Sequence, residues 1–324
     1  MKINMGHGSG GILTQNLIDG VFKKHFTGSL LRQGGDSAVF EAAGRLAFTT
    51  DSFVVQPLFF PGGDIGRLAV CGTVNDLLTA GARPIYLSAA FILEEGLDTD
   101  TLETVVSSMT EAAAEAGVEI VTGDTKVVEG RGGLIINTSG VGLVREDYAP
   151  QPCRPCDAVL LSGNLGEHHA AIMSRRMGIE NDIMSDCAPL KDMVTRLLDA
   201  GVAVRAMRDV TRGGLGTVLH ELAALHGVGM ELTEAALPVS PDVHGFCGIL
   251  GLDPLYMGNE GKMAFIVGRE DAERALGILR GSKYGGNASI IGCITDGRSV
   301  VMKTPIGGSR VVGPLAGEGL PRIC

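Results

Sequence analysis

Five aspartates are the side chains of this sequence with the most suggestive chemistry, because most of them stand beside glycine or other small residues. They are Asp36, Asp51, Asp76, Asp124 and Asp209. Magnesium prefers hard oxygen ligands and is usually held by a few carboxylates together with nucleotide phosphates. The chain contains no G-x-x-x-x-G-K-S/T sequence, so it is not a P-loop protein. The pattern therefore predicts a magnesium–ATP site of a non-classical design.

A glycine-rich N-terminus is the first candidate for contacts with the phosphates of that nucleotide. Residues 6–11 read GHGSGG, but only five residues precede them, so no strand can lead into the motif as a dinucleotide-binding unit requires. We interpret it as a loop in which backbone N–H groups, those of Gly8, Gly10 and Gly11, close over phosphate. A flexible N-terminus is the alternative.

A second candidate for anion binding is the segment DVTRGGLG at residues 209–216. It places Asp209, Arg212, Gly213 and Gly214 directly before a predicted helix, and a helix N-terminus is a ready anion site. The carboxylate of Asp209 suits such a site only if a cation lies beside it. This segment therefore also indicates a metal.

A third segment combines a carboxylate with an ammonium group. A strand is predicted over residues 119–122, and it is followed by Gly123-Asp124-Thr125-Lys126, which we interpret as a turn at the end of that strand. Asp124 and Lys126 either form a simple ion pair or meet a metal and a phosphate.

The chain ends on a thiol, Cys324, after a segment rich in glycine and proline that begins at Pro305. Terminal residues fray unless they are held, so this thiol could reach solvent, a partner or the protein's own active site. The alternative is an incidental thiol. Cys153-x-x-Cys156 has no second pair and lies in a proline-rich linker, which argues against zinc. The adjacent histidines at 168 and 169 would point about 100° apart on a helix and cannot chelate together.

Alternating helices and strands must position these residues. In the first half a helix is expected from Asp64, its N-cap, to Ala80, and Asp76 shares a face with small residues that leave room for a polar ligand. A second helix is expected from Asp100 to Ala116, with Asp100 and Glu103 at capping-box spacing. A strand pair is expected over residues 134–144. In the second half we expect strands at 158–161, 263–267, 289–294 and 299–303 and helices at 167–176, 190–199, 215–226 and 271–280.

This alternation predicts an α/β architecture in both halves. We divide the chain into an N-terminal glycine-rich loop and lead-in (1–40), an ATP-binding and dimerisation domain (41–150), a C-terminal domain (151–304) and a flexible tail ending in Cys324 (305–324). The boundary near 150 follows from the three prolines between Arg145 and Cys156.

Composition excludes several classes of protein. The 324 residues predict about two domains, and 45% hydrophobic content is enough for sizeable cores. The net charge of -10 argues against nucleic-acid binding, which needs clustered Lys and Arg. No run approaches the roughly 18 apolar residues of a membrane helix, and the N-terminus has no signal-peptide core. Seven scattered cysteines indicate reduced thiols and a cytoplasmic protein.

Several motifs together resemble the HypE family of hydrogenase maturation factors, in the aminoimidazole-ribonucleotide-synthetase-like (PurM-like) superfamily. They are GHGSGG at 6–11, GDSAVF at 35–40, TTDSFVVQPLFFPGGDIG at 49–66, CGTVNDLLTAGARP at 71–84, VTGDTKVVE at 121–129, RDVTRGGLGTVLHELA at 208–223, GNEGK at 258–262 and PRIC at 321–324. The terminal PRIC is the part specific to HypE. The family often has two adjacent acids where this chain has Gly35-Asp36.

The resemblance implies an α/β (α+β sandwich-like), PurM-like two-domain architecture, with N-terminal strands pairing in a homodimer and a flexible C-terminal tail. Such proteins accept a carbamoyl group on the terminal cysteine from a HypF-type carbamoyltransferase. They use ATP to dehydrate it to a thiocyanate, and the cyano group passes to iron on a HypC–HypD complex for nickel–iron hydrogenase. No nucleic acid or membrane is involved.

The resemblance also implies roles for the site residues. Asp36, Asp76 and Asp209 would hold Mg²⁺, while Asp51 and Asp124 would assist and Lys126 would touch phosphate. Losing phosphate to leave a nitrile requires a base that takes protons from nitrogen. Glu260 is the candidate base and Lys126 the second, with an exposed turn glutamate as the alternative for Glu260.

Two other functions stay open. One is a different ATP-dependent synthetase of the same superfamily, although the N-terminal loop has no cysteine for selenium chemistry and neither such synthetase needs a C-terminal thiol. The other is a non-catalytic scaffold that only carries a group on its tail. ATP hydrolysis that depends on the carbamoylated tail would distinguish the enzyme from the scaffold.

Overall fold

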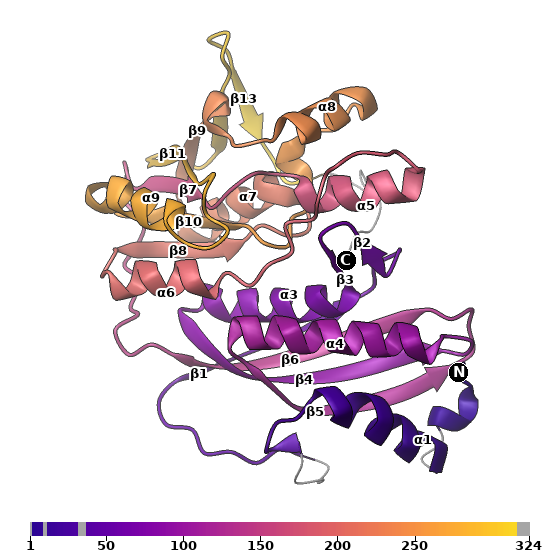
Figure 1. The fold of residues 1–324 in the computed structure, drawn as a ribbon. Coiled ribbons are helices and arrows are strands. Elements are labelled where there is room, and N and C mark those ends of the chain that lie inside the picture. Colours follow the sequence, from indigo (N-terminus) through magenta and orange to yellow (C-terminus); the bar gives the residue numbers. More distant parts are fainter. Residues whose placement is uncertain (1, 9–11, 32–36, 316–324) are drawn as a thin grey trace. The chain divides into compact units, whose positions relative to one another are not determined.

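The computed structural model describes the chain except for residues 1, 9–11, 32–36 and 316–324 (Figure 1). The described residues form two compact units, one within residues 1–59 and 63–146 and the other within residues 60–62 and 147–315. Within the described ranges, no helix is both long and apolar enough to cross a membrane.

The first unit is built on a four-stranded sheet with the order β1-β6-β4-β5. Strands β4 and β5 are parallel, and β6 runs antiparallel to both β1 and β4. The bounds are β1 Leu46–Phe53, β4 Ala82–Glu94, β5 Glu119–Val128 and β6 Leu134–Val144. A short ribbon of β2 (Phe59–Phe60) and β3 (Gly63–Asp64) precedes the first long helix.

Two long helices, α3 (Ile65–Thr79) and α4 (Thr99–Ala116), lie on the same face of this sheet (Figure 1). The N-terminal segment adds η1 (Met5–Gly8), α1 (Ile12–Leu17), the π-helical η2 (Ile18–Phe22) and α2 (Lys23–His25). The ring of Phe22 in η2 contacts Phe91 of β4, with 4.8 Å between centroids, so the N-terminal helices cover the same side as α3 and α4.

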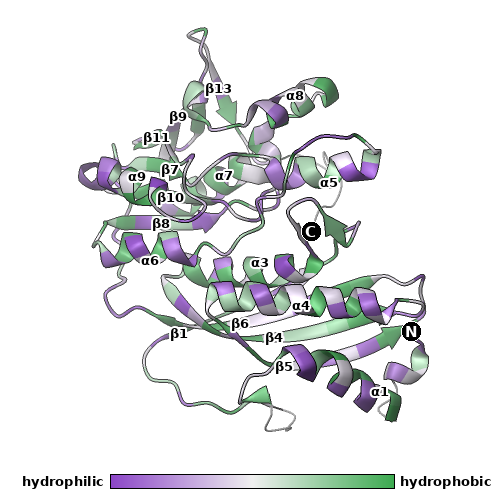
Figure 2. Ribbon diagram, in the orientation of Figure 1, coloured by the Kyte–Doolittle hydropathy of each residue, from purple (hydrophilic) through white to green (hydrophobic). Residues whose placement is uncertain are grey.

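The start of α3 agrees with the prediction from sequence. The Asp64 carboxylate accepts hydrogen bonds from the backbone N–H groups of Gly66 (2.6 Å) and Arg67 (3.1 Å), as an N-cap should. Helix α4 has a buried stripe that includes Leu102, Val105, Val106 and Met109, and Figure 2 shows hydrophobic and hydrophilic residues alternating around this helix. The expected capping box is wrong, because the helix begins one residue earlier with Asp98 as N-cap and without a side-chain cap bond.

Two predictions about strands in this unit are wrong. Strand β5 runs through the segment that we interpreted as a turn, so Asp124 and Lys126 lie within a strand. Gly123 is needed there for close approach, because a Cβ atom would lie 2.3 Å from the carbonyl oxygen of Ala89. Residues 134–144 form one strand rather than a pair, and their alternating burial fits a strand with one covered face.

The second unit contains a seven-stranded sheet with the order β13-β12-β9-β11-β7-β10-β8. The strands are β7 Ala158–Leu161, β8 Val204–Asp209, β9 Gly229–Thr233, β10 Met263–Val267, β11 Ser289–Thr295, β12 Val300–Lys303 and β13 Ser309–Val312. The helices are α5 Glu167–Met177, α6 Lys191–Asp199, α7 Gly214–His226, α8 Pro241–Leu250 and α9 Ala272–Arg280, with short 3₁₀ turns η4 Glu234–Ala236, η5 Pro254–Tyr256 and η6 Arg269–Asp271. Strands β8, β9 and β13 and helix α8 were not predicted from the sequence.

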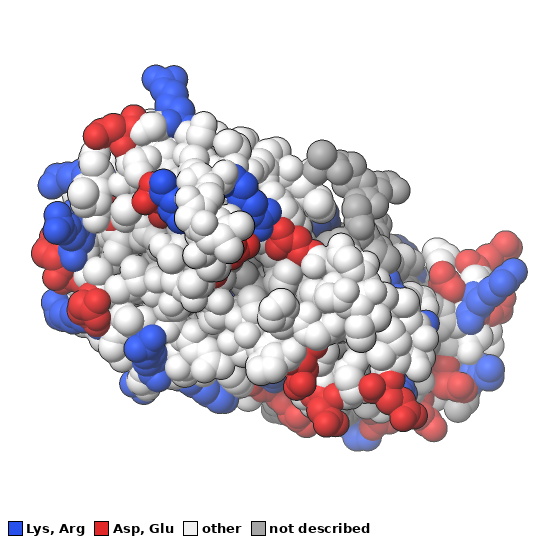
Figure 3. All heavy atoms as spheres, turned by 90° about the horizontal axis from the view of Figure 1, so that it is seen from above, with Lys and Arg blue, Asp and Glu red and all other residues white. Residues whose placement is uncertain are grey.

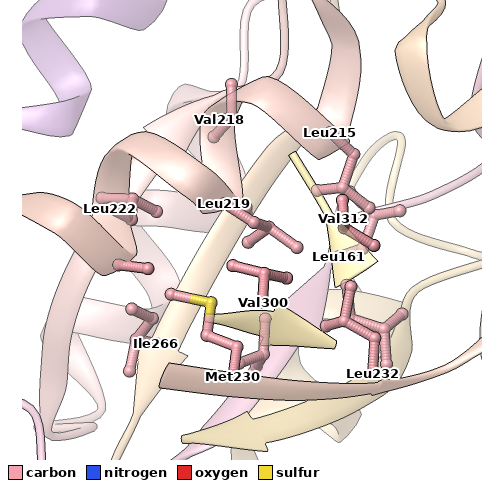
Figure 4. Packing of buried hydrophobic residues seen from close by; sticks show 14 of the residues in the cluster. Leu161, Leu215, Val218, Leu219, Leu222, Met230, Leu232, Ile266, Val300 and Val312 are labelled. Atoms are coloured by element: carbon pink, nitrogen blue, oxygen red, sulfur yellow. The ribbon is translucent and has the colours of Figure 1, made fainter. Parts of the chain in front are cut away.

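An aliphatic core holds α7 on this sheet. Leu215, Val218, Leu219 and Leu222 of α7 pack toward residues of several strands, among them Leu161, Met230, Leu232, Ile266, Val300 and Val312 (Figure 4). Burying an aliphatic side chain of this size contributes about 1.5–3 kcal/mol. The core therefore fixes the start of α7, and with it the glycine segment that precedes the helix.

The expected free tail from residue 305 is partly wrong. Residues 300–303 and 309–312 form a hairpin in which Val300 is opposite Val312, and Val312 is 1% exposed. Because burial of this valine holds β13 in the sheet, the segment up to residue 312 is part of the second unit. Cys324 lies outside the described residues.

Candidate nucleotide site

The seam between α3 and β1 in the first unit contains two of the predicted acids. Thr49, Asp51 and Phe53 alternate along β1 and face α3. The Thr49 hydroxyl donates a hydrogen bond to the Asp76 carboxylate (2.9 Å). The Asp51 carboxylate lies 3.9 Å from where a Cβ atom of Gly72 would be, one helical turn from Asp76. The fold therefore brings Asp51 and Asp76 to one seam.

The second pair of predicted residues, Asp124 and Lys126, lies on the other face of the sheet. Lys126 Nζ is 2.8 Å from the Asp124 carboxylate, and this hydrogen bond holds the pKa of Asp124 below its usual range. In the sheet register Asp124 is opposite Ala90 of β4, whereas Asp51 shares its row with Thr138 and Ala89. Neighbouring residues of a strand point to opposite faces. Asp124 and Lys126 are therefore on the face away from α3, and one copy of this unit does not bring them to Asp51.

The start of the N-terminal glycine loop lies against strand β5. A Cβ atom on Gly8 would be 2.8 Å from the backbone nitrogen of Val127 in β5, so only glycine allows this approach. Gly8 thus lies against Val127 on β5, one residue after Lys126 in the strand. Gly10, Gly11 and Asp36 lie outside the described residues.

The second unit brings Asp209 and Glu260 to neighbouring segments. Asp209 ends β8 opposite Met263 of β10, and it is 8% exposed. The N–H of Val210 donates to the carbonyl of Lys262 (2.9 Å), and the N–H of Asn259 donates to the carbonyl of Val210 (3.2 Å). Glu260 is 4% exposed, so the alternative that it is an exposed turn glutamate is wrong.

A buried carboxylate holds the loop that contains Glu260. Asp186 accepts hydrogen bonds from the backbone N–H of Glu260 (3.1 Å) and of Gly261 (3.3 Å), and from Lys262 Nζ (2.9 Å). Glu167 lies 3.4 Å from the same ammonium. We call Asp186, Lys262 and Glu167 the buried ion cluster.

The charge state of the buried ion cluster follows from its composition. Burial alone would lower the pKa of Lys262, but Asp186 and Glu167 outweigh burial and hold this pKa above its usual value. The ammonium therefore stays charged and attached. This cluster fixes the backbone of the Glu260 loop.

The segment before α7 has the predicted form. Gly213 is the N-cap with a φ of 82°, and Gly214 has a φ of 66°. This left-handed backbone favours glycine and turns the chain from β8 into the helix. Arg212 is exposed at this turn. An exposed guanidinium beside a helix N-terminus suits a phosphate.

The seam between α3 and β1 contains oxygen donors that suit a magnesium ion. The seam supplies carboxylate and hydroxyl oxygens from Asp51, Asp76 and Thr49, which is the donor chemistry that Mg²⁺ prefers. Among the described residues, no three His, Cys, Asp or Glu side chains gather closely enough to hold a metal by themselves. The donors therefore fit an ion that is held by one or two carboxylates and by phosphate.

Other candidates from sequence have structural roles. Burial lowers the pKa of His169 to about 4, helped by His168 and Arg176, and its Nδ1 accepts from the N–H of Gly258. Burial likewise raises the pKa of the Cys153 thiol to about 11, so this cysteine is a poor nucleophile.

Charged groups on the face drawn in Figure 3 are of both signs. Acidic and basic side chains are interspersed there, with uncharged surface between them. This face lacks the clustered Lys and Arg that contact nucleic-acid phosphates.

Asp186 and the buried role of Lys262 were missed by the sequence analysis. Asp186 lies 76 positions from Lys262 and belongs to no motif. The run Gly258-Asn259-Glu260-Gly261-Lys262 was a usable signal, since a charged residue in a glycine turn that leads into an apolar strand is buried only with a partner.

Both units match models of a known protein family. Residues 34–144 match the family model "AIR synthase related protein, N-terminal domain", and residues 154–304 match the model of its C-terminal domain. The carbamoyl dehydratase HypE of Cupriavidus necator is 52% identical, and the alignment covers 100% of this chain and 95% of that protein.

Two solved structures are similar over nearly the whole chain. One is the hydrogenase maturation protein HypE in complex with ATP, with a TM-score of 0.95, 46% identity and 99% of each chain covered. The other is a HypE–HypF complex, with a TM-score of 0.81, 46% identity and 92% and 99% of the two chains covered. The two-domain PurM-like α/β fold is thus shared with these proteins. The chain belongs to the HypE carbamoyl dehydratase family of the AIR synthase related proteins.

Proposed function

We propose that this protein uses ATP to dehydrate an S-carbamoyl group on Cys324 to a thiocyanate, and so supplies the cyanide ligand for nickel–iron hydrogenase. The observation that carries the proposal is the full-length similarity to a HypE structure solved with ATP. The terminal thiol of PRIC supplies the atom that would carry the group.

The reaction requires ATP because an amide oxygen is a very poor leaving group. Transfer of the γ-phosphoryl to the carbamoyl oxygen, with loss of one N–H proton, gives an S-bound O-phosphoryl imidate, S–C(=NH)–O–phosphate, and ADP. Loss of phosphate with the second N–H proton then leaves the S–C≡N group. Both steps depend on positioning and charge neutralisation of the phosphoryl group.

The chain's own residues would divide this work between the two units. Lys126, with Gly8, Gly10 and Gly11, would contact phosphate, as would Arg212, Gly213 and Gly214. Asp36, Asp76 and Asp209 would hold Mg²⁺, assisted by Asp51 and Asp124. When bound, the ion would neutralise charge on the phosphates.

Glu260 would act as the base toward the carbamoyl nitrogen, with Lys126 as the second candidate. Its segment is adjacent to Asp209 and is held through its backbone by Asp186. A carboxylate whose backbone is fixed can be held within reach of a proton on the substrate.

The outer face of the four-stranded sheet supports a homodimer. On that face Phe48 is 72% exposed, Leu46 is 50% exposed and Ile92 is 39% exposed. Three large apolar side chains exposed on one sheet face favour packing against a second copy. Asp124 and Lys126 lie on this face, so a second copy could complete the nucleotide site with them. The variant Phe48→Glu should give monomers in light scattering, and unchanged dimers would contradict the pairing.

The partners would be a HypF-type carbamoyltransferase as donor and a HypC–HypD complex as acceptor of the cyano group. A relative has been solved as a HypE–HypF complex, which supports the first of these.

Mass analysis of the C-terminal peptide tests the proposal. After incubation with the carbamoyltransferase, carbamoyl phosphate and ATP, the peptide should gain the mass of a cyano group, and Cys324→Ser should abolish the gain. A label on another residue would contradict the proposal. Carbamoylation without ATP turnover would instead favour the carrier scaffold.

The variant Glu260→Gln tests the base. It should bind ATP normally and accumulate S-carbamoyl-Cys324, because the proton acceptor is missing. Cyanation at the normal rate would remove Glu260 from this role. Glu221→Gln on the exposed side of α7 is a matched control, since Glu221 contacts only Arg208 among the described ion pairs.

A further inference from the structure

The last described residues of the chain are fastened to the start of α7. The Tyr256 hydroxyl donates a hydrogen bond to the carbonyl of Gly313 (3.1 Å). Two residues later, the N–H of Leu315 donates to Thr217 Oγ1 (3.1 Å). Both contacts lie beyond the end of β13 and therefore are no part of the sheet.

The surface that receives these residues is built for close packing. Tyr256 lies against the first turn of α7, where a Cβ atom on Gly216 would be 2.7 Å from the tyrosine ring. A Cβ atom on Gly214 would be 2.5 Å from the Tyr256 backbone. The two glycines in the first turn of α7, Gly214 and Gly216, thus let Tyr256 lie close enough to the helix to reach Gly313.

Residues that precede Gly313 are held to the same unit by further contacts. Arg310 is 3.1 Å from Asp253, which caps η5, and Val312 is buried in the core of α7. From Arg310 to Leu315 the chain is therefore held at four places, and the last of these is next to the Asp209–Gly214 segment.

We propose that Tyr256 and Thr217 are positioning residues that anchor the root of the C-terminal tail beside the nucleotide-binding segment. This inference rests on the proposed function, in which Cys324 carries the reacting group. Nine residues follow Leu315, so an extended chain from the anchor reaches at most about 30 Å. A tail that started at residue 305 would reach about twice as far. The anchor thus confines the thiol to a smaller volume around its own Asp209–Gly214 segment.

The effect on rate follows from effective concentration. Without the two hydrogen bonds the last held residue before Cys324 would be the buried Val312, which twelve residues follow, instead of Leu315, which nine residues follow. Effective concentration falls with about the −3/2 power of length, which alone gives a factor of about 1.5. The two hydrogen bonds also fix the direction in which the chain leaves the anchor, and this effect is lost as well. We therefore expect the conversion of S-carbamoyl-Cys324 to slow about threefold or more.

The test compares Tyr256→Phe/Thr217→Val with Thr110→Val, a half-buried helical threonine whose hydroxyl bonds only within α4. In the double variant, single-turnover conversion of S-carbamoyl-Cys324 should slow about threefold or more, while the KM for ATP stays within twofold. Amide exchange of Leu315 should be severalfold faster because its acceptor is gone. The control should change none of these.

Several outcomes would overturn the proposed anchor. Unchanged exchange at Leu315 would show that the anchor does not exist, and faster exchange with an unchanged conversion rate would show that it does not position the tail. A parallel rise in the KM for ATP would indicate general damage and would also overturn the proposal. If the double variant fails to fold, Tyr256→Phe alone repeats the measurement with the ring in place. Failure of the proposed function would appear instead as no cyanation in the unaltered protein, with the exchange test unaffected.

Discussion

The two units contain ion pairs of nearly equal length in opposite surroundings. In the first unit Lys126 and Asp124 are 2.8 Å apart, with side chains 65% and 62% exposed. In the second unit Lys262 and Asp186 are 2.9 Å apart, with side chains 7% and 1% exposed. Water screens the first pair and leaves it free to exchange partners, whereas the second pair cannot open without stranding a buried charge. Burial, and not distance, therefore separates a pair that can receive a ligand from one that holds a loop.

The variant Lys262→Met should give the largest effect on stability. It leaves the buried Asp186 and the partly buried Glu167 without their cation. Removing one partner of a buried pair costs about 3–5 kcal/mol. The free energy of unfolding from urea titration measures this loss. The Glu260 loop should loosen as well, which faster amide exchange at Glu260 and Gly261 would report.

A double variant separates the ion pair from simple packing. Asp186→Leu added to Lys262→Met removes both charges, and it should recover part of the lost stability because an apolar pair needs no compensation. If Lys262→Met alone costs less than about 1 kcal/mol, the contrast between the two units is wrong.

The second largest effect is expected from pH, and again in the second unit. Because the pKa of His169 is lowered to about 4 from 6.5, the unfolded chain takes up its proton first as the pH falls. This histidine therefore costs stability progressively from pH 6.5 down to about 4, by about 3 kcal/mol in total. Above pH 6.5 it has no such effect.

The variant His169→Gln should flatten the pH dependence of the unfolding free energy over that interval. Thr110→Val, which removes no titratable group, is the control and should leave the slope as it is. An identical slope in both variants would mean that burial of His169 does not govern acid stability.

A pair of glycine variants gives a smaller effect, of opposite sign in the two units. A Cβ atom on Gly72 would lie 2.9 Å from the ring of buried Phe53, and such overpacking costs about 1–3 kcal/mol. Gly277 in α9 has nothing within 4 Å of that position, so Gly277→Ala should stabilise its helix by up to about 1 kcal/mol. Thermal unfolding of Gly72→Ala and Gly277→Ala measures both. Equal shifts would show that the seam between α3 and β1 is not tightly packed.

Local patterns were enough to predict much of this fold. Helix α3 and strand β10 were predicted to within a residue, because Asp64 is a clear N-cap and residues 263–267 form an apolar run between polar turns. Helix α8 was missed because three glycines, Gly245, Gly248 and Gly251, lie in or directly after it and weaken its helical pattern.

The arrangement of the site was less predictable, for reasons of geometry. Gly123 was read as part of a turn, whereas it serves a close backbone approach to Ala89, and that difference decides on which face of the sheet Asp124 and Lys126 lie. The bonds from Asp186 to the Glu260 loop cross more than 70 positions and follow no spacing rule. A sequence can thus indicate which side chains take part in a reaction without indicating which of them lie close together.

The smallest effect on stability is expected from Lys126→Met, and it tests the comparison most directly. Two exposed side chains gain little from pairing, so the free energy of unfolding should change by no more than about 1 kcal/mol, and less at high salt. ATP-dependent cyanation should nevertheless fall, because Lys126 is proposed to contact phosphate. Measuring both in one preparation separates the two roles of a charge. A stability loss as large as that of Lys262→Met would mean that the Asp124–Lys126 pair is structural, and the proposed phosphate contact would then lack its support.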